Sequence, residues 1–339
     1  MRAYRLDEPG RPDGLVLHHG EPADPGPTGV LVRVHAAALN RRDALILSGR
    51  YPLPARPGVI ALSDGAGEVV AVGAEVTRFR VGDRVTGSYF PRWTDGRLRP
   101  DLADQLGCTV DGLLTEYAVL DEQALAAVPA HLAWAEAAAL SCAGVAAWRA
   151  LTGGGPLLPG ATVLTLGGGD VSLCAVQFAK AHGCRVLAVS GSAAGAERLA
   201  ALGADHVLDR RRTPEWSAEV RRLTGGAGAD LVVETHGPAT IDQSVRAAAL
   251  YGQIVLLWVV SDEPAALRIT DEAYAGSLAT IRREFVGSRT DLEAMLRAVG
   301  QHGLRPAIGR EFGFDEVPDA YRHFLARETV GKVVIRVAG

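Results

Sequence analysis

The chain has 339 residues, of which 48% are hydrophobic and 22% are charged, with a formal net charge of −4. This length and apolar content predict a large buried core that is divided between two domains. The slightly acidic balance excludes electrostatic attraction to nucleic acid or to an anionic membrane as a basis for function.

Residues 1–125 alternate short apolar runs with glycine and proline turn signals, which predicts a strand-rich, partly closed β domain. Over residues 133–153 the spacing of apolar and small residues changes to the helical period. None of the four cysteines forms a CxxC pair, and no apolar run is long enough to cross a bilayer. We therefore expect a cytoplasmic protein without a secretory signal, a disulfide framework or a zinc knuckle.

A β–α alternation follows, and it predicts a parallel, doubly wound sheet with right-handed crossovers. The predicted strands are residues 162–166, 185–189, 205–208, 230–234, 252–258 and 282–286. Beyond them the pattern predicts a helix over 290–303, a second helix over 314–328 and a closing strand over 331–337.

The stretch "TVLTLGGGDVSLCAVQFAK" predicts a strand, a glycine-rich turn and the start of a helix. Gly167 and Gly169 occupy the first two glycine positions of a G-x-G-x-x-G fingerprint, with Gly168 between them and Ser172 at the third position. The first glycine permits the tight turn, and the second lets backbone N–H groups approach a pyrophosphate. Between a strand and an apolar helix, the motif predicts a dinucleotide site at the helix N-terminus.

The end of the second predicted strand bears on which dinucleotide is bound. Folds that bind NAD often carry Asp or Glu there, and the carboxylate accepts a hydrogen bond from the ribose 2′-OH. This chain has Ser190, Gly191 and Ser192 instead. The lack of an acidic side chain disfavours NAD and favours NADP.

With its flanking segments included, the chain resembles the zinc-independent medium-chain dehydrogenase/reductase family, the relatives of quinone oxidoreductase. The segments "AALNRRDALILSGRYP", "LSDGAGEVVAVGAEVTRFRVGDRV", "LSCAGVAAW", "RLAALGADHV" and "GKVVIR" follow one another in family order. The resemblance implies an α/β fold in which a Rossmann doubly wound sheet, residues 126–287, is inserted in a GroES-like, partly closed β-barrel catalytic domain, residues 1–125 and 288–339. It also implies a cleft between the domains, a small-molecule substrate and a homodimer.

The resemblance places catalytic candidates in the first domain. In zinc-free relatives polar side chains orient a C=C or C=O acceptor, and Asn40, Asp43 and Tyr51 match those positions. Tyr51 would hydrogen-bond a carbonyl oxygen or donate a proton, and Asn40 would orient that oxygen. Alternatively, Asn40 and Asp43 only fix the backbone of the loop. Where the zinc-dependent branch has its three ligands, this chain has Asn40, Ser63 and Cys142, so we expect no zinc.

The implied cofactor contacts partly match the family. Phe285 and Gly287, in "EFVGS", match the strand that flanks the nicotinamide, and Lys332 lies near the closing turn. Gly195 replaces a lysine that meets the 2′-phosphate in relatives, which leaves Arg198 as a candidate substitute. These positions imply NADP(H) as the cofactor.

Four further positions depart from the family where relatives touch the cofactor. Asp170 puts a carboxylate beside the expected pyrophosphate, where it either caps the helix or replaces a lost anion. Ala146 replaces a threonine near the nicotinamide, His236 replaces a small residue, and Trp258 stands in place of glycine. Together these changes act against cofactor binding, because overpacking of a snug site costs about 1–3 kcal/mol.

Two functions therefore stay open. The first is an NADP(H)-dependent reductase of an enone, a quinone or a carbonyl compound. The second is a redox-silent enzyme without a cofactor that performs cyclisation, isomerisation or elimination on a biosynthetic intermediate. In the second case Asp170, His236 and Asp43 are acid/base candidates, and Trp258 is a hydrophobic wall of the site.

Overall fold

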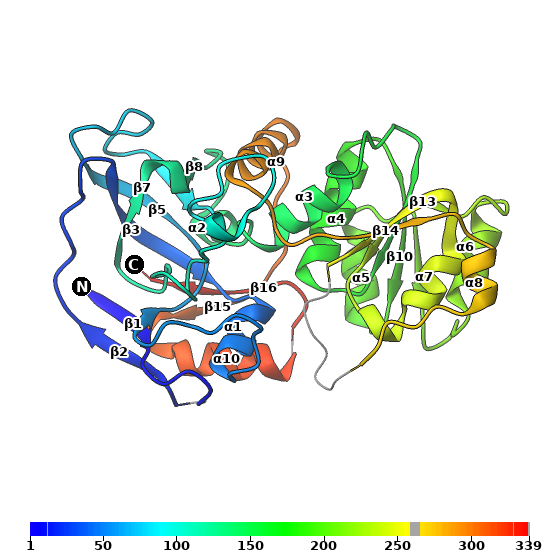
Figure 1. The fold of residues 1–339 in the computed structure, drawn as a ribbon, viewed down its shortest axis with the longest axis horizontal. Coiled ribbons are helices and arrows are strands. Elements are labelled where there is room, and N and C mark those ends of the chain that lie inside the picture. Colours follow the sequence, from blue (N-terminus) through cyan, green and yellow to red (C-terminus); the bar gives the residue numbers. More distant parts are fainter. Residues whose placement is uncertain (12, 258–264, 328, 338–339) are drawn as a thin grey trace. The chain divides into compact units, whose positions relative to one another are not determined.

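The structure is a computed structural model that describes residues 1–11, 13–257, 265–327 and 329–337 (Figure 1). The chain forms two compact units, one of Met1–Val145 with Gly287–Gly339 and the other of Ala146–Val286. The predicted division, after residues 125 and 287, differs from these bounds chiefly in residues 126–145. Within the described residues, no helix combines the length and the apolar character needed to span a membrane.

The first unit is rich in strands. Its strands are β1 (Arg2–Leu6), β2 (Leu15–His19), β3 (Gly29–Ala38), β4 (Val59–Ile60), β5 (Asp64–Val72), β6 (Arg84–Gly87), β7 (Tyr117–Asp121), β8 (Leu125–Ala127), β15 (Ile308–Gly313) and β16 (Lys332–Arg336). Its helices are α1 (Arg41–Leu47), α2 (Trp134–Ala138), α9 (Arg289–His302) and α10 (Val317–Ala326). The predicted helices over 290–303 and 314–328 and the predicted closing strand over 331–337 correspond to α9, α10 and β16.

Two sheets organise the described part of this unit. A three-stranded sheet has the order β2-β1-β4, and a seven-stranded sheet has the order β15-β16-β3-β5-β6-β8, with β7 also paired to β3. The central strand β3 buries Val30, Val32 and Val34 and exposes Arg33, as expected when one face of a strand packs on a core. Strand β16 pairs with β3 so that Val334 lies opposite Ala38, which brings the C-terminal strand beside the start of α1.

The helical stretch predicted over residues 133–153 is interrupted in the structure. Helix α2 ends at Ala138, and α3 (Ala143–Thr152) begins after a short turn. In that turn the backbone N–H of Cys142 donates to Asp64 Oδ2 at 3.2 Å instead of continuing a helix. The periodicity of small residues could not reveal this break, because the partner of the N–H lies far away in the sequence.

The second unit is the predicted doubly wound sheet. Its remaining elements are β9 (Thr162–Leu166), α4 (Asp170–Ala181), β10 (Arg185–Ser190), α5 (Ala193–Ala201), β11 (His206–Asp209), α6 (Trp216–Leu223), β12 (Ala229–Glu234), α7 (Ile241–Ala247), β13 (Ala248–Leu256), α8 (Asp271–Ala275) and β14 (Thr280–Arg283). The described strands are parallel and lie in the order β11-β10-β9-β12-β13-β14. The chain therefore reverses its direction of strand addition between β9 and β12, the point at which such sheets bind ligands.

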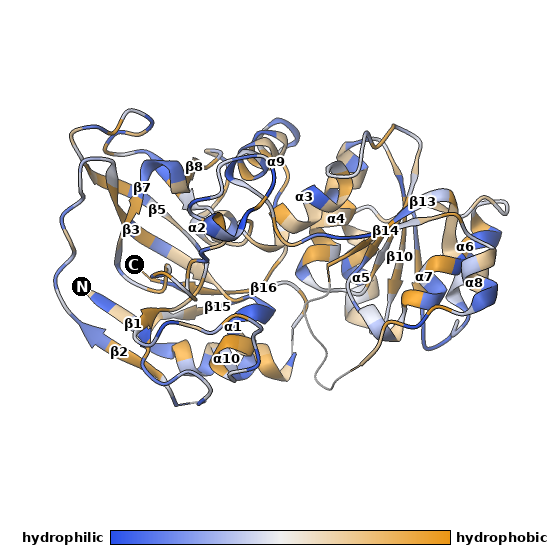
Figure 2. Cartoon of the chain, viewed as in Figure 1, coloured by the Kyte–Doolittle hydropathy of each residue, from blue (hydrophilic) through white to orange (hydrophobic). Residues whose placement is uncertain are grey.

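One face of this sheet is closed by a hydrophobic cluster. Leu164, Leu187 and Val232 project from neighbouring strands and pack with Trp216 of α6 and Ile241 of α7. Figure 2 shows the hydrophobic character of the strands and the mixed character of α6 and α7. Helices that cross from strand to strand thus cover the sheet, and they leave the carboxyl ends of the strands as the functional edge.

Candidate active site and cofactor site

Asn40 stands at the junction of β3 and α1, directly before the helix. Asp43 Oδ2 accepts the backbone N–H of Asn40 at 2.8 Å, and the Asn40 carbonyl accepts the N–H of Asp43 at 3.0 Å. These two bonds close the helix N-terminus, so the Asn40 side chain is not needed as a cap. Asp43 is thus placed to fix the loop backbone, which is the alternative role that the sequence allowed for it.

The Asn40 side chain turns instead to a buried lysine. Lys332 Nζ donates to Asn40 Oδ1 at 2.5 Å and to the Leu39 carbonyl at 2.9 Å, and it lies 3.5 Å from Asp64 Oδ2. Lys332 is 2% exposed and Asp64 is fully buried, so the two charges compensate one another away from water. Because the ammonium requires an acceptor, the amide oxygen of Asn40 faces it and the amide nitrogen faces away. Among the described residues, that buried Nδ2 group has no hydrogen-bond partner.

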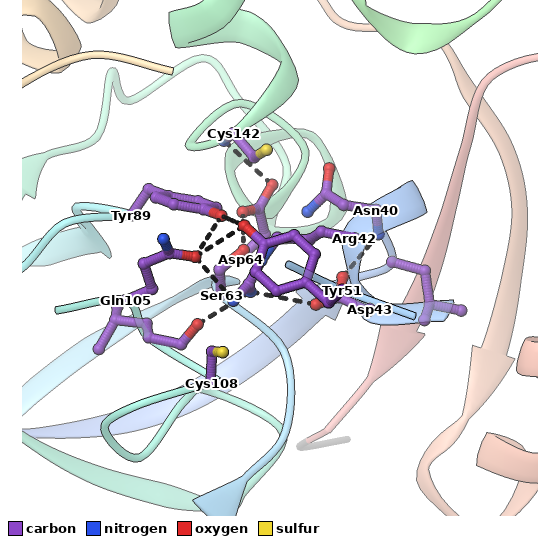
Figure 3. Close-up of polar contacts among 12 residues, drawn as sticks. Asn40, Arg42, Asp43, Tyr51, Ser63, Asp64, Tyr89, Gln105, Cys108 and Cys142 are labelled. Atoms are coloured by element: carbon purple, nitrogen blue, oxygen red, sulfur yellow. Dashed lines mark hydrogen bonds and ion pairs between the residues drawn. The ribbon is translucent and has the colours of Figure 1, made fainter. Parts of the chain in front are cut away.

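The three positions that match the metal ligands of the zinc-dependent branch gather around Asp64 (Figure 3). Ser63 Oγ donates to Asp64 Oδ1 at 2.8 Å, and the Cys142 backbone N–H donates to Asp64 Oδ2. Burial raises the pKa of the Cys142 thiol, which disfavours the thiolate that zinc requires. The Asn40 oxygen is already bound to Lys332. This donor set does not fit a zinc ion.

Two tyrosines and a glutamine form a buried triangle next to α1 (Figure 3). The hydroxyl groups of Tyr51 and Tyr89 are 2.9 Å apart, and each is 2.8 Å from Gln105 Oε1. The two tyrosine hydroxyl groups have two protons to share among three oxygen–oxygen contacts. At any moment, therefore, one of the three contacts is not a hydrogen bond. One tyrosine can therefore turn its O–H toward an incoming oxygen and lose only one of these bonds.

A guanidinium group lies against this triangle. Arg42 Cζ is 5.4 Å from the ring centre of Tyr51 and 4.8 Å from that of Tyr89, and its Nη1 donates to Asp43 Oδ1 at 3.2 Å. Burial raises the pKa of both tyrosines, and the Arg42 cation acts in the opposite direction by favouring a phenolate. Burial also raises the pKa of Asp43 to about 6, against the lowering effect of Arg42. The site can thus hold a proton on Tyr51 and stabilise the charge that its loss would leave.

The predicted glycine-rich turn lies at the carboxyl end of β9, where the strand order reverses. Gly167 has φ +83°, a left-handed conformation that favours glycine. A Cβ at Gly169 would have no atom within 4 Å, so the backbone before α4 is open to a ligand. Gly169 supplies no side-chain cap to α4, so its backbone N–H groups are the donors that a pyrophosphate would use, next to the carboxylate of Asp170 in the same turn. Ser172 Oγ is used locally, because it donates to the Leu166 carbonyl at 2.5 Å.

Serine side chains shape the end of β10. Ser190 Oγ donates to the Ser192 carbonyl at 2.8 Å, and Ser192 Oγ caps α5 by accepting the Gly195 N–H at 3.1 Å. A Cβ at Gly195 would meet Ser190 Oγ at 2.8 Å, and one at Gly168 would meet the Gly195 Cα at 2.9 Å. The first turn of α5 therefore packs closely on the glycine-rich turn, and a side chain at position 195 would have to displace the Ser190 and Ser192 hydroxyl groups.

A buried carboxylate holds the turn that follows β12. Glu234 Oε1 accepts the N–H groups of His236 and Gly237, at 2.7 and 3.0 Å, and the Thr240 hydroxyl at 2.8 Å. Glu234 Oε2 accepts the Ser244 hydroxyl at 2.5 Å, and burial raises the pKa of this carboxyl. The turn puts the His236 ring against the glycine-rich turn, since a Cβ at Gly167 would lie 2.4 Å from His236 Cε1.

Substitution of Glu234 tests this arrangement. We expect Glu234→Leu to lower the free energy of unfolding by about 2–3 kcal/mol, because it leaves several buried donors without an acceptor. Glu234→Gln should cost less than about 1 kcal/mol, since the amide keeps one acceptor oxygen and its NH₂ can donate to Ser244 Oγ. Urea unfolding followed by circular dichroism measures both. Equal losses of unfolding free energy in the two variants would contradict the idea that hydrogen bonds to Glu234 hold this turn.

The predicted site residues fall into two groups. Asn40, Asp43, Tyr51, Gly287 and Lys332 lie in the first unit, and the others described lie in the second: Gly167, Gly168, Gly169, Asp170, Ser172, Ser190, Ser192, His236 and Phe285. Asp170 is the half-buried first residue of α4, where its charge complements the helix dipole. Ala146, in α3, is buried. Trp258 lies outside the described residues.

The sequence did not reveal four residues that contact the predicted site residues of the first unit. Tyr89 and Gln105 lie in a long loop without a motif, and Asp64 follows a position that was considered only as a metal ligand. Arg42 belongs to an "RRD" run that is typical of a solvated helix start, yet it is 4% exposed, whereas Arg41 is exposed. Glu234 could have been recognised from the sequence, because it is an acidic residue that directly follows the apolar run Leu231–Val233 in a buried strand.

Two family models match the chain. The model described as alcohol dehydrogenase GroES-like domain matches residues 26–130, and the one described as zinc-binding dehydrogenase matches residues 171–301. The chain is 37% identical to a zinc-type alcohol dehydrogenase-like protein of Schizosaccharomyces pombe, over 92% of this chain and 91% of that protein. It is 31% identical to a quinone oxidoreductase of Pseudomonas aeruginosa, over 96% of each chain.

A solved structure agrees with these relatives. The crystal structure of a putative alcohol dehydrogenase from Sinorhizobium meliloti superposes with a TM-score of 0.92 at 37% identity, over 99% of this chain and 98% of that one. The GroES-like model falls within the strand-rich first unit, and the superposition extends over both units. The chain therefore belongs to the medium-chain dehydrogenase/reductase family of oxidoreductases, which includes alcohol dehydrogenases and quinone oxidoreductases.

Proposed function

We propose that this protein is a zinc-independent reductase that uses NADPH to reduce a polarised C=C or C=O bond in an enone, a quinone or another carbonyl compound. The observation that carries the proposal is the buried Nδ2 group of Asn40, which has no partner among the described residues and is oriented by Lys332. An unmet buried donor costs about 1–3 kcal/mol. A substrate oxygen is the partner that would satisfy it.

Zinc independence is supported by the chemistry of the donor set. The amide oxygen at position 40 already accepts from an ammonium group, Ser63 donates to a carboxylate, and the Cys142 thiol is held in its protonated form. Zinc sites use thiolate, imidazole or carboxylate ligands. Instead of a metal ion, Lys332 supplies a fixed positive charge next to Asn40. That charge polarises the amide group and makes its Nδ2–H a stronger hydrogen-bond donor.

Proton supply is the task of the tyrosine triangle in this proposal. A bound reduced nicotinamide supplies the hydride to the electrophilic carbon of the substrate. Asn40 Nδ2–H stabilises the negative charge that develops on the substrate oxygen. Tyr51 then gives its hydroxyl proton to the anion that the hydride has created, and Tyr89 can return a proton to Tyr51 across their 2.9 Å contact. Arg42 offsets the charge on the phenolate in the meantime.

The second unit supports the cofactor assignment. The open backbone at Gly169 and the N-terminus of α4 fit a pyrophosphate. The end of β10 offers Ser190 and Ser192 rather than an acid, which favours NADP over NAD.

Titration of the purified protein with NADPH, followed by tryptophan fluorescence, tests this function. We expect a dissociation constant in the micromolar range and less than one tenth of a zinc ion per chain by elemental analysis. A zinc ion bound at one per chain would overturn the zinc-independent part of the proposal, whatever the affinity for NADPH.

A redox-silent enzyme is the competing function, and the position of His236 favours it. The imidazole lies against Gly167, on the turn where a pyrophosphate would bind. If this ring closes the site, the protein will not bind NADPH at millimolar concentration, and His236 with Asp170 would be left to act as acid and base. The same titration therefore separates the two functions.

A further inference from the structure

The side chain of Arg210, at the carboxyl edge of the parallel sheet, takes no part in the candidate active site of the first unit. Arg210 directly follows β11, whose last residue, Asp209, lies opposite Ser190 of β10. Its backbone N–H donates to the Ser190 carbonyl at 3.0 Å, which fixes its position beside the end of β10. A Cβ at Gly191 would lie 2.7 Å from Arg210 Nε and 3.0 Å from Nη2. The guanidinium group therefore lies directly over Gly191.

The surroundings of Arg210 leave its charge available. Asp209, the neighbouring carboxylate, is engaged by Arg211, whose Nε and Nη2 donate to it at 3.0 and 2.8 Å. These hydrogen bonds lower the pKa of Asp209 to about 2, so the carboxylate stays ionised and bound to Arg211. The side chain of Arg210 makes no hydrogen bond or ion pair with any other described residue. Among the described residues at the end of β11, Arg210 therefore keeps its charge available, and the acid next to it is already paired.

Arg210 also faces the glycine-rich turn. It lines a small hollow together with Gly167, Gly191 and His236. In sheets of this strand order, the adenosine ribose of a dinucleotide lies between the turn after the first strand and the end of the second strand. The guanidinium group is thus on the side of the hollow where the ribose 2′ position would be.

We propose that Arg210 binds the 2′-phosphate of NADPH and is the residue that makes this protein prefer NADPH to NADH. Arginine suits this role because its planar group binds phosphate through two parallel hydrogen bonds. Position 195 on α5, where the family resemblance implies a lysine, is a glycine, so a cation for this phosphate is supplied here from the end of β11. The inference rests on the proposed use of NADPH and names the contact that selects it.

Dissociation constants of the full chain for NADPH and NADH, measured by fluorescence or calorimetry, test the inference. We expect Arg210→Gln to weaken NADPH binding about 10- to 100-fold, the loss typical of one charge-assisted phosphate contact, and to leave NADH binding unchanged. Arg198→Gln tests the other candidate for the 2′-phosphate, on α5. Arg222→Gln is the matched control, because it removes the same charge from an exposed position on α6, outside this hollow. Adenosine 2′,5′-bisphosphate should compete with NADPH in the wild-type protein and lose affinity in Arg210→Gln alone.

Each outcome distinguishes this inference from the function on which it rests. Binding of NADPH with a loss confined to Arg210→Gln supports both. Wild-type affinity in Arg210→Gln, equal binding of NADH and NADPH, or a loss confined to Arg198→Gln would overturn the role of Arg210 and leave the reductase function in place. Failure of the wild-type protein to bind either nucleotide at millimolar concentration would overturn the reductase function, and the role of Arg210 with it.

Discussion

Replacement of Tyr51 by Phe is expected to lower kcat/KM for an enone or a quinone by about 100-fold or more, the usual contribution of a general acid. The dissociation constant of NADPH should stay unchanged, because the glycine-rich turn is built by β9 and α4, whereas the Tyr51 hydroxyl contacts Tyr89 and Gln105. The buried hydroxyl is held by Tyr89 and Gln105, so its loss removes a proton donor without emptying a large volume. Steady-state kinetics at saturating NADPH measure the effect.

Two controls separate catalysis from packing. Tyr4→Phe removes a hydroxyl from another buried tyrosine of the first unit, outside the triangle, and should leave kcat/KM within a factor of about two. Tyr89→Phe removes the partner of Tyr51 and keeps the donor, so its loss should be smaller than that of Tyr51→Phe. Wild-type kcat/KM in Tyr51→Phe would show that the proton comes from another group.

Replacement of Lys332 by Met is expected to lower the free energy of unfolding by about 3–5 kcal/mol. The substitution leaves Asp64 charged, fully buried and without its counter-ion, and it leaves the Asn40 oxygen without its donor. Adding Asp64→Asn to the same chain should recover most of the loss, because the uncompensated charge then disappears. Urea unfolding gives the three values.

The chain provides a matched control, since Lys180 and Lys332 are its only lysines. Lys180 pairs with Asp205 at 2.9 Å, but the two side chains are 35% and 37% exposed. Lys180→Met should therefore cost no more than about 1 kcal/mol. Similar losses in Lys180→Met and Lys332→Met would contradict the idea that burial makes the Lys332 pair important.

Local sequence pattern was sufficient for the doubly wound sheet. Strands β9 and β12 coincide with their predicted ranges to within one residue, because each is a short apolar run between clear turn signals. Strand β13 begins four residues before its predicted start of 252, and β14 ends at Arg283 rather than 286. In both cases the pairing with a neighbouring strand decides the boundary, and the local sequence pattern does not.

The candidate site was only partly predictable, because its contacts join distant segments. Asn40, Asp43 and Tyr51 lie in one recognisable stretch, so the family resemblance was enough to name them. The pairing of Lys332 with Asp64 depends on β16 lying beside β3, a register that no local pattern encodes. The sequence alone could not identify Arg210 as a binding residue for the same reason, because its position over Gly191 depends on the pairing of β10 with β11.

Transfer of deuterium from NADPH labelled at the nicotinamide C4 position is the most direct test of a metal-free reductase. The protein would be stripped of metal by a chelator, then given the labelled cofactor with a panel of enones, quinones and aldehydes. We predict that at least one product carries deuterium on its former electrophilic carbon and that added zinc leaves the rate unchanged. No transfer to any acceptor, or transfer only after zinc is restored, would contradict the account.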